Sequence, residues 1–224
     1  MARDTWWNLS PDKRQRVLNA ALREFGRKGF SAGSLNAVAR EAGIAKGSLF
    51  QYFEDKLDLY ATICQQVAEE ARTATLNGVD PGGDRRLFDV IRDLTVNWLR
   101  YFRAHPLARD IGLAIKHEMD PSVRAAVSST VNAGYVDALS PLAKQAADRG
   151  ELGPGVDPDQ VVAMLILVLR FLDAAPFYPH LDPVLDLYDK KPDEVEAVAM
   201  DLIGAVERAY APPQRKRKKA DDRR

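Results

Sequence analysis

The sequence has a single cysteine, Cys64, and only three histidines. One cysteine excludes an intramolecular disulfide framework and a cage of thiolate metal ligands, and it is typical of proteins from a reducing compartment. His105, His117 and His180 lie far apart, without the HExxH spacing of a zinc-binding helix. We therefore expect no metal and no cofactor.

Long apolar runs and common catalytic strings are also missing. The longest uncharged apolar run, Val161 to Leu169, has nine residues, about half of what a membrane span needs. Residues 1–10 lack the apolar stretch of a secretory signal. These absences predict a soluble cytoplasmic protein without a membrane partner. GxSxG, Walker A and GxGxxG strings do not occur either, so the sequence favours a protein that is not an enzyme.

The charges are balanced in number but not in position. The chain has 224 residues, which is long enough for one large domain or two small ones. It contains 32 basic and 32 acidic side chains. Residues 1–53 carry a net charge of +5, residues 54–211 carry −10 and residues 212–224 carry +5. This asymmetry indicates nucleic-acid contact at one end, a solvated charged face being the alternative. We expect the acidic body to face away from the nucleic acid.

Apolar residues recur at helical spacing in almost every segment, which predicts an all-α fold. A first helix begins at Ser10-Pro11, with Ser10 as its cap, and Gly29 is its expected stop. The other expected helices cover residues 34–42, 46–53, 56–77, 85–104, 107–119, 121–149, 157–172 and 192–210. Pro141 is expected to kink or split the helix over residues 121–149, and residues 174–191 are expected to be irregular.

Two short helices joined at Gly43 have the form of a helix-turn-helix. Val38, Leu49 and Phe53 are placed to pack on the first helix. The outer face then carries Lys46, Ser48, Gln51 and Tyr52, which are side chains that reach phosphates and base edges.

The strings FGRKGF at 25–30, VAREAGIAKGSLFQYF at 38–53 and KLDL at 56–59 closely resemble the N-terminal signature of the TetR (tetracycline-repressor-like) family of bacterial regulators. The resemblance implies an N-terminal three-helix helix-turn-helix domain, residues 1–55, followed by a larger helical effector-binding and dimerisation domain, residues 56–211. It also implies a homodimeric repressor that leaves a palindromic double-stranded DNA operator when a small effector binds. The acidic body disfavours a large polyanionic effector, and its aromatic and aliphatic residues favour an apolar or amphipathic one. A helical interaction adaptor and a helical enzyme are the competing classes.

Eight DNA-binding positions follow from the resemblance. Ser34 and Lys56 would clamp phosphates, and the second short helix would place six residues in or beside the major groove: Lys46, Gly47, Ser48, Phe50, Gln51 and Tyr52. For Phe50 and Tyr52 the alternative is packing against the base of the next helix. The sequence departs from the family pattern at Ala45, where a capping Ser or Thr is usual, and at Phe50, where Tyr is usual.

A short recognition helix reads few base pairs, so two copies are needed for specific binding. The expected dimer surface consists of Val161, Met164, Leu165, Val168, Val198, Leu202 and Val206 on the last two helices, burial within one subunit being the alternative.

Effector contacts are expected from polar or aromatic residues on otherwise apolar helices, namely Trp98, Tyr101, Phe102, His117, Tyr135, Arg170 and Asp173. Ordinary core or interface positions are the alternative, with Arg170 and Asp173 able to pair with each other. The tail, residues 212–224, has no apolar residue in its basic run and is expected to be disordered. It would otherwise add a phosphate contact.

Overall fold

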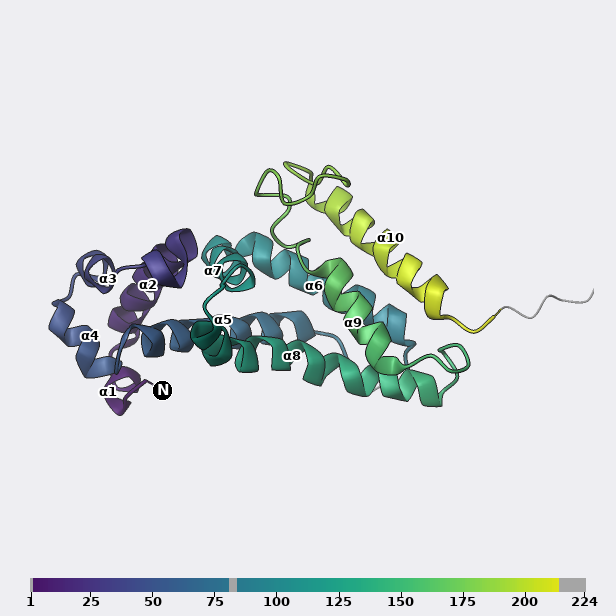
Figure 1. The fold of residues 1–224 in the computed structure, drawn as a ribbon, viewed down its shortest axis with the longest axis horizontal. Coiled ribbons are helices and arrows are strands. Elements are labelled where there is room, and N and C mark those ends of the chain that lie inside the picture. Colours follow the sequence, from purple (N-terminus) through teal and green to yellow (C-terminus); the bar gives the residue numbers. More distant parts are fainter. Residues whose placement is uncertain (1, 81–83, 214–224) are drawn as a thin grey trace, which may run out of the picture.

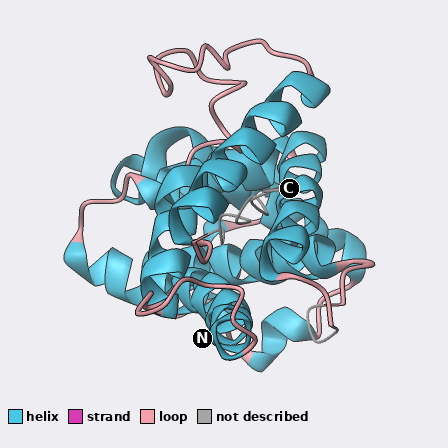
Figure 2. Ribbon diagram, turned by 90° about the vertical axis from the view of Figure 1, so that its right-hand side faces the viewer, coloured by secondary structure: helices cyan, strands magenta, loops and turns pink. Residues whose placement is uncertain are grey.

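The structure is a computed structural model that describes residues 2–80 and 84–213, apart from the side chains of residues 128–135. Within these residues all regular secondary structure is helical, as the sequence predicts (Figures 1 and 2). The helices are α1 (Asp4–Trp7), α2 (Pro11–Ala32), α3 (Leu35–Ala42), α4 (Lys46–Tyr52), α5 (Lys56–Leu76), α6 (Leu87–Ala104), α7 (Pro106–Lys116), α8 (Pro121–Asp148), α9 (Pro158–Leu169) and α10 (Pro192–Tyr210).

Several helix ends differ from the expected ones. Helix α1 was not expected, and within the described residues the Ser10 side chain does not cap α2. Gly29 does interrupt α2, with a left-handed φ of 67°, before one more helical turn. Helix α8 continues through Pro141 instead of splitting there. Pro141 and Asp137 are both exposed, so the carbonyl that the proline leaves without a helical donor is open to water.

The helices form an elongated molecule in which α1 to α4 lie at one end (Figure 1). Helix α5 leads away from this end along the body, where it packs against α6 and α8. Helices α9 and α10 lie further along the body. Residues 2–53 of the basic segment therefore occupy one end of the molecule, whereas the orientation of the acidic body toward DNA stays a prediction.

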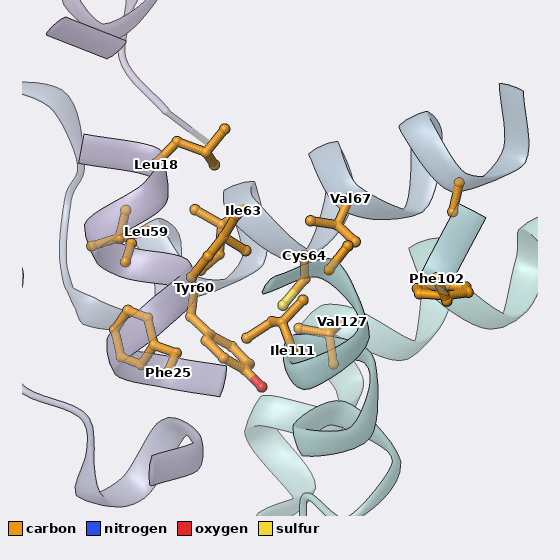
Figure 3. Close-up of a cluster of buried hydrophobic side chains, with 14 of the residues drawn as sticks. Leu18, Phe25, Leu59, Tyr60, Ile63, Cys64, Val67, Phe102, Ile111 and Val127 are labelled. Atoms are coloured by element: carbon orange, nitrogen blue, oxygen red, sulfur yellow. The ribbon is translucent and has the colours of Figure 1, made fainter. Parts of the chain in front are cut away.

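One apolar core joins the N-terminal helices to the body (Figure 3). Phe25 of α2 meets the ring of Tyr60 of α5 edge to face, with centroids 5.2 Å apart, and Ile111 of α7 is fully buried in the same cluster. A Cβ added at Gly26 would lie 3.0 Å from Cβ of Asp110, so α2 and α7 approach closely. The domain boundary at residue 55 stays a prediction, and the core runs across it.

Candidate nucleic-acid interface

The turn between α3 and α4 depends on the backbone of Gly43. Gly43 ends α3 in the left-handed conformation, with φ 69° and ψ 36°, which costs a residue with a Cβ about 1 kcal/mol. Its N–H donates to the carbonyl of Arg40, and the Ile44 N–H donates to that of Ala39, the pairing of a helix C-cap. This turn sets the direction in which α4 leaves the helix pair.

Glu24 holds the start of α3 against α2. Its side chain is only 9% exposed and its Oε1 accepts from Lys28 Nζ at 2.9 Å and from the Ser34 N–H at 3.0 Å. Burial raises the pKa of Glu24, but the bonds from Lys28 and Ser34 and the charge of Arg40 outweigh it and hold the pKa below its ordinary value. Ser34 also caps α3, since its Oγ accepts from the Ala37 N–H at 3.4 Å.

A Glu24→Gln variant should be less stable near neutral pH by about 1 kcal/mol, because it loses the charge opposite Lys28. The folded-state pKa of Glu24 is depressed. Its contribution is therefore complete above the unfolded value of about 4.3 and is lost as the pH falls through the folded pKa. The difference in unfolding free energy between the two proteins, measured in urea at pH 7 and pH 3, should shrink in acid.

The control for this comparison is Glu41→Gln, which removes an exposed ion pair with Arg23. That change should lower the unfolding free energy by less than about 0.5 kcal/mol at either pH. A difference between wild type and Glu24→Gln that grows in acid would contradict the role given to Glu24.

Helix α4 presents a polar face beside a buried one. Leu49 and Phe53 are buried, as predicted, whereas Lys46, Gly47 and Gln51 are exposed. Phe50 is 41% exposed, so in this structure it does not pack as core. An added Cβ at Gly47 would meet nothing within 4 Å among the described residues, so the fold itself does not require glycine there. The surface at Gly47 therefore leaves room for the backbone of a bound molecule.

Besides Ser34, two further residues expected to bind DNA have other partners. Tyr52 is 5% exposed and packs beside Trp6, with ring centroids 6.3 Å apart, so we correct its assignment from groove contact to core. Lys56 donates to the Ser31 carbonyl at 3.2 Å and lies 4.6 Å from the centre of the Phe30 ring. Burial lowers the pKa of Lys56, and a phosphate contact would require its release from these partners.

Residues 3–6 lie against α4 in a way that the sequence did not reveal. The Arg3 N–H donates to the Tyr52 carbonyl at 2.8 Å, and Trp6 is fully buried against Phe53, with ring centroids 4.9 Å apart. A bulky Trp6-Trp7 pair just before a helix start was the available signal. A segment of four residues is too short to show a helical period in its sequence.

The expected effector residues whose side chains are described lie in several different surroundings. Trp98, Tyr101 and Phe102 are at most 9% exposed and pack on one another in the core. His117 is exposed and lines an open groove of about 540 Å³ between residues 26–31 of α2 and residues of α7. The side chain of Tyr135 lies outside the described residues.

Asp173 pairs with Lys116 and not with Arg170, which corrects the expected pairing. Lys116 Nζ lies 2.7 Å from Oδ1 and 2.8 Å from Oδ2 of Asp173. Arg170 is exposed and donates to the Lys116 carbonyl at 3.4 Å, because the chain leaves the helix after Leu169. Burial raises the pKa of Asp173, and the neighbouring Lys116 opposes that rise.

The guanidinium of Arg109 lies close to this pair and is 3.6 Å from the centre of the Phe177 ring. The Tyr178 hydroxyl donates to Asp110. The region between α6, α7 and residues 171–178 thus holds several charged groups among aromatic rings.

The expected dimer residues divide into two sets. Val161, Leu165 and Val206 are at most 5% exposed and fill the core formed by α6, α8, α9 and α10, so we correct their assignment from interface to subunit core. Met164 is 39% exposed, and Val168, Val198 and Leu202 are partly buried. Leu167, at 65% exposed, lies on the same outer face of α9 as Met164.

In residues 2–80 and 84–213 no helix combines the length and the apolar character needed to cross a bilayer. The same residues contain no group of three or more His, Cys, Asp or Glu side chains arranged to hold a metal ion. The expectation about the basic tail concerns residues 212–224, of which 214–224 lie outside the described residues.

Comparison with known proteins gives a consistent result for the N-terminal helices. Residues 17–63 match the family model described as bacterial regulatory proteins, tetR family. Over 52 residues the chain is 40% identical to the HTH-type transcriptional regulator AcrR of Shigella flexneri, a match covering 23% of this chain and 24% of that protein. The chain therefore spans about a quarter of the length of this curated relative.

Solved structures extend the similarity of the fold to the body. A TetR family transcriptional regulator from Chloroflexus aurantiacus superposes with a TM-score of 0.70 at 24% identity, covering 94% of this chain and 99% of the other. The transcriptional regulator FadR from Bacillus subtilis, in complex with stearoyl-CoA, also gives 0.70, at 13% identity, with 86% and 96% covered. At these identities the likeness concerns the fold.

Proposed function

We propose, from the premise that this chain carries the DNA-binding helix-turn-helix of the tetR family of bacterial regulatory proteins, that it is a homodimeric transcriptional repressor. It binds a palindromic operator and leaves it when a small amphipathic effector binds the body. It has no catalytic role of its own, and it acts in the cytoplasm, where the bacterial chromosome lies. The observation that carries the proposal is the exposed face of α4, held at one end of the molecule by Gly43 and a buried core.

The geometry of α4 supports contact with the major groove. Lys46 and Gln51 are exposed, and these side chains bond guanine and adenine edges or phosphates. Phe50 offers an apolar ring beside them, suited to a thymine methyl group. The phosphate clamps assigned to Ser34 and Lys56 belong to the same proposal, with Lys56 exchanging its Ser31 carbonyl for a phosphate.

Dimer formation is part of the proposal because the chain has one helix-turn-helix. The outer face of α9, with Met164 and Leu167 exposed and Val168 partly so, is the surface that we assign to the partner. Val198 and Leu202 of α10 would extend it. Apolar side chains of this size stabilise an association when they leave water.

The effector class follows from the residues around the Lys116–Asp173 pair. Trp98 and Phe171 lie near the Lys116 ammonium, which is 5.8 Å from the centre of each ring. Aromatic rings beside a partly buried cation suit a ligand with an apolar part and an anionic group. The FadR structure contains such a ligand, stearoyl-CoA. We therefore propose a fatty acid or acyl thioester as the first class to test.

Two linked measurements test this function. The wild-type chain should bind a fluorescent duplex from the region upstream of its own gene, and an acyl thioester at 100 times its dissociation constant should stabilise the protein by about 2.7 kcal/mol. The same compound should weaken DNA binding. Because the coupling between two ligands is reciprocal, DNA should weaken binding of the compound by the same factor. A compound that stabilises the protein but leaves DNA affinity unchanged would contradict release by an effector, and turnover of it would indicate an enzyme.

A further inference from the structure

The last carbonyl groups of α4 are bonded from outside the helix. A helix leaves its final four carbonyls without intrahelical donors, and in α4 these belong to residues 49–52. The Leu49 carbonyl accepts from the Phe53 N–H at 2.8 Å. The other three accept from the segment that precedes α2, which we call the N-terminal arm and define as residues 3–6.

Each of these three bonds is made by a different group of the arm. The Phe50 carbonyl accepts from Arg3 Nη1 at 2.9 Å, the Tyr52 carbonyl accepts from the Arg3 N–H at 2.8 Å, and the Gln51 carbonyl accepts from the Thr5 hydroxyl. The guanidinium of Arg3 also places a positive charge at the negative end of the helix dipole.

Trp6 fixes the arm to the domain. Its side chain is fully buried and packs against the rings of Tyr52 and Phe53. The indole Nε1 is buried and has no hydrogen-bond partner among the described residues, so Trp6 acts through packing rather than through a polar bond. The neighbouring Trp7 is 57% exposed.

The other end of α4 has no comparable support. Its N-cap residue is Ala45, which has no side-chain acceptor for the free N–H groups. A helix of seven residues is marginal without external contacts, so bonds at its C-terminal end add to the hold of the buried Leu49 and Phe53. The arm supplies those bonds, and it lies outside residues 17–63, which carry the family match.

We propose that Arg3, Thr5 and Trp6 are positioning residues for DNA binding, which hold α4 in the orientation that presents Lys46 and Gln51 to the groove. This inference rests on the proposed function and assigns the arm no contact with DNA. In the proposed role, the arm makes α4 rigid at its C-terminal end, because Ala45 does not cap the helix at its N-terminal end.

The test compares full-length chains binding the upstream duplex at several salt concentrations. The variant Arg3→Met with Thr5→Val removes two side-chain donors and keeps Trp6 in place. We expect about tenfold weaker binding, with the slope of log affinity against log salt unchanged, because no phosphate contact is lost. Amide hydrogen exchange of residues 49–53 should become faster in the same variant, while that of α9 and α10 should not change.

Adding Ala45→Ser to that variant provides the decisive measurement. A hydroxyl at the N-cap stabilises α4 from its other end, so DNA affinity should recover by at least threefold. Trp6→Phe should bind nearly as well as wild type, since it keeps an aromatic ring and the indole N–H is unpaired. Trp6→Ala should lose binding, whereas Trp7→Ala should not.

The outcomes separate the inference from the function on which it rests. If wild type binds and the double variant binds equally well, the inference is overturned and the function stands. A salt slope that falls by about one, without rescue by Ala45→Ser, would identify Arg3 as a phosphate contact and overturn the positioning role. If wild type does not bind, or if Lys46→Ala with Gln51→Ala binds normally, the proposed function fails and the inference fails with it.

Discussion

Replacing Lys46 and Gln51 by alanine should weaken binding to the upstream duplex at least about 100-fold. Both side chains are exposed on α4, and a good contact to a base edge contributes about 1 to 3 kcal/mol. A dimer loses each of the two contacts twice, so at about 1 kcal/mol per contact the total loss is about 4 kcal/mol. This exceeds the loss of about 2.7 kcal/mol that a 100-fold change represents. Fluorescence anisotropy at fixed salt measures the change.

The chain offers a matched control for this variant. Lys144 and Gln145 form the same pair of residue types, exposed on α8 in the body. Alanine at both positions removes the same charge and the same amide but should leave DNA affinity within about twofold. Equal losses in the two variants would mean that net charge, and not the α4 surface, governs binding.

Glutamate at Met164 and Leu167 should convert the proposed dimer into monomers and remove most of the DNA binding. The two residues are 39% and 65% exposed on α9 in the isolated subunit, so the changes should not disturb its core. Within an apolar interface each glutamate would be buried without a partner, which costs several kcal/mol. Analytical ultracentrifugation at micromolar concentration measures the oligomeric state.

Val184→Glu is the control for the surface change, because Val184 is 81% exposed and belongs to the segment between α9 and α10. It should leave the protein dimeric. A dimer that persists with glutamate at Met164 and Leu167 would show that the partner binds elsewhere.

The periodic features of this fold were predictable from sequence, and the pairings between distant residues were not. The strings around Gly43 indicated the helix-turn-helix, since the residues that form it are neighbours in the chain. Apolar residues all around α9 could not show which side faces its own subunit, and this is why Val161 and Leu165 were assigned to the dimer surface. Their burial depends on how α8 and α10 pack against α9, which the periodicity of one helix does not show.

The same limit explains the errors at single side chains. Arg170 and Asp173 are close in sequence, but Asp173 reaches Lys116, 57 positions away. Tyr52 is at a suitable position for the groove by spacing alone, yet Trp6, 46 residues earlier, covers its ring. The pattern of residues within one helix gives no information on contacts between residues this far apart in the chain.

The close approach of α2 to α7 at Gly26 has a consequence for protein engineering. Phe25, Tyr60 and Ile111 belong to one cluster, so a cut at residue 55 would leave the inner face of α2 without its cover. A chimeric regulator that joins this DNA-binding domain to a foreign sensor would need to retain α5 and α7, or an equivalent surface, as part of the transplanted unit. A fusion should therefore join the foreign sensor at a point C-terminal to residue 55, which is the boundary that the sequence motif suggests.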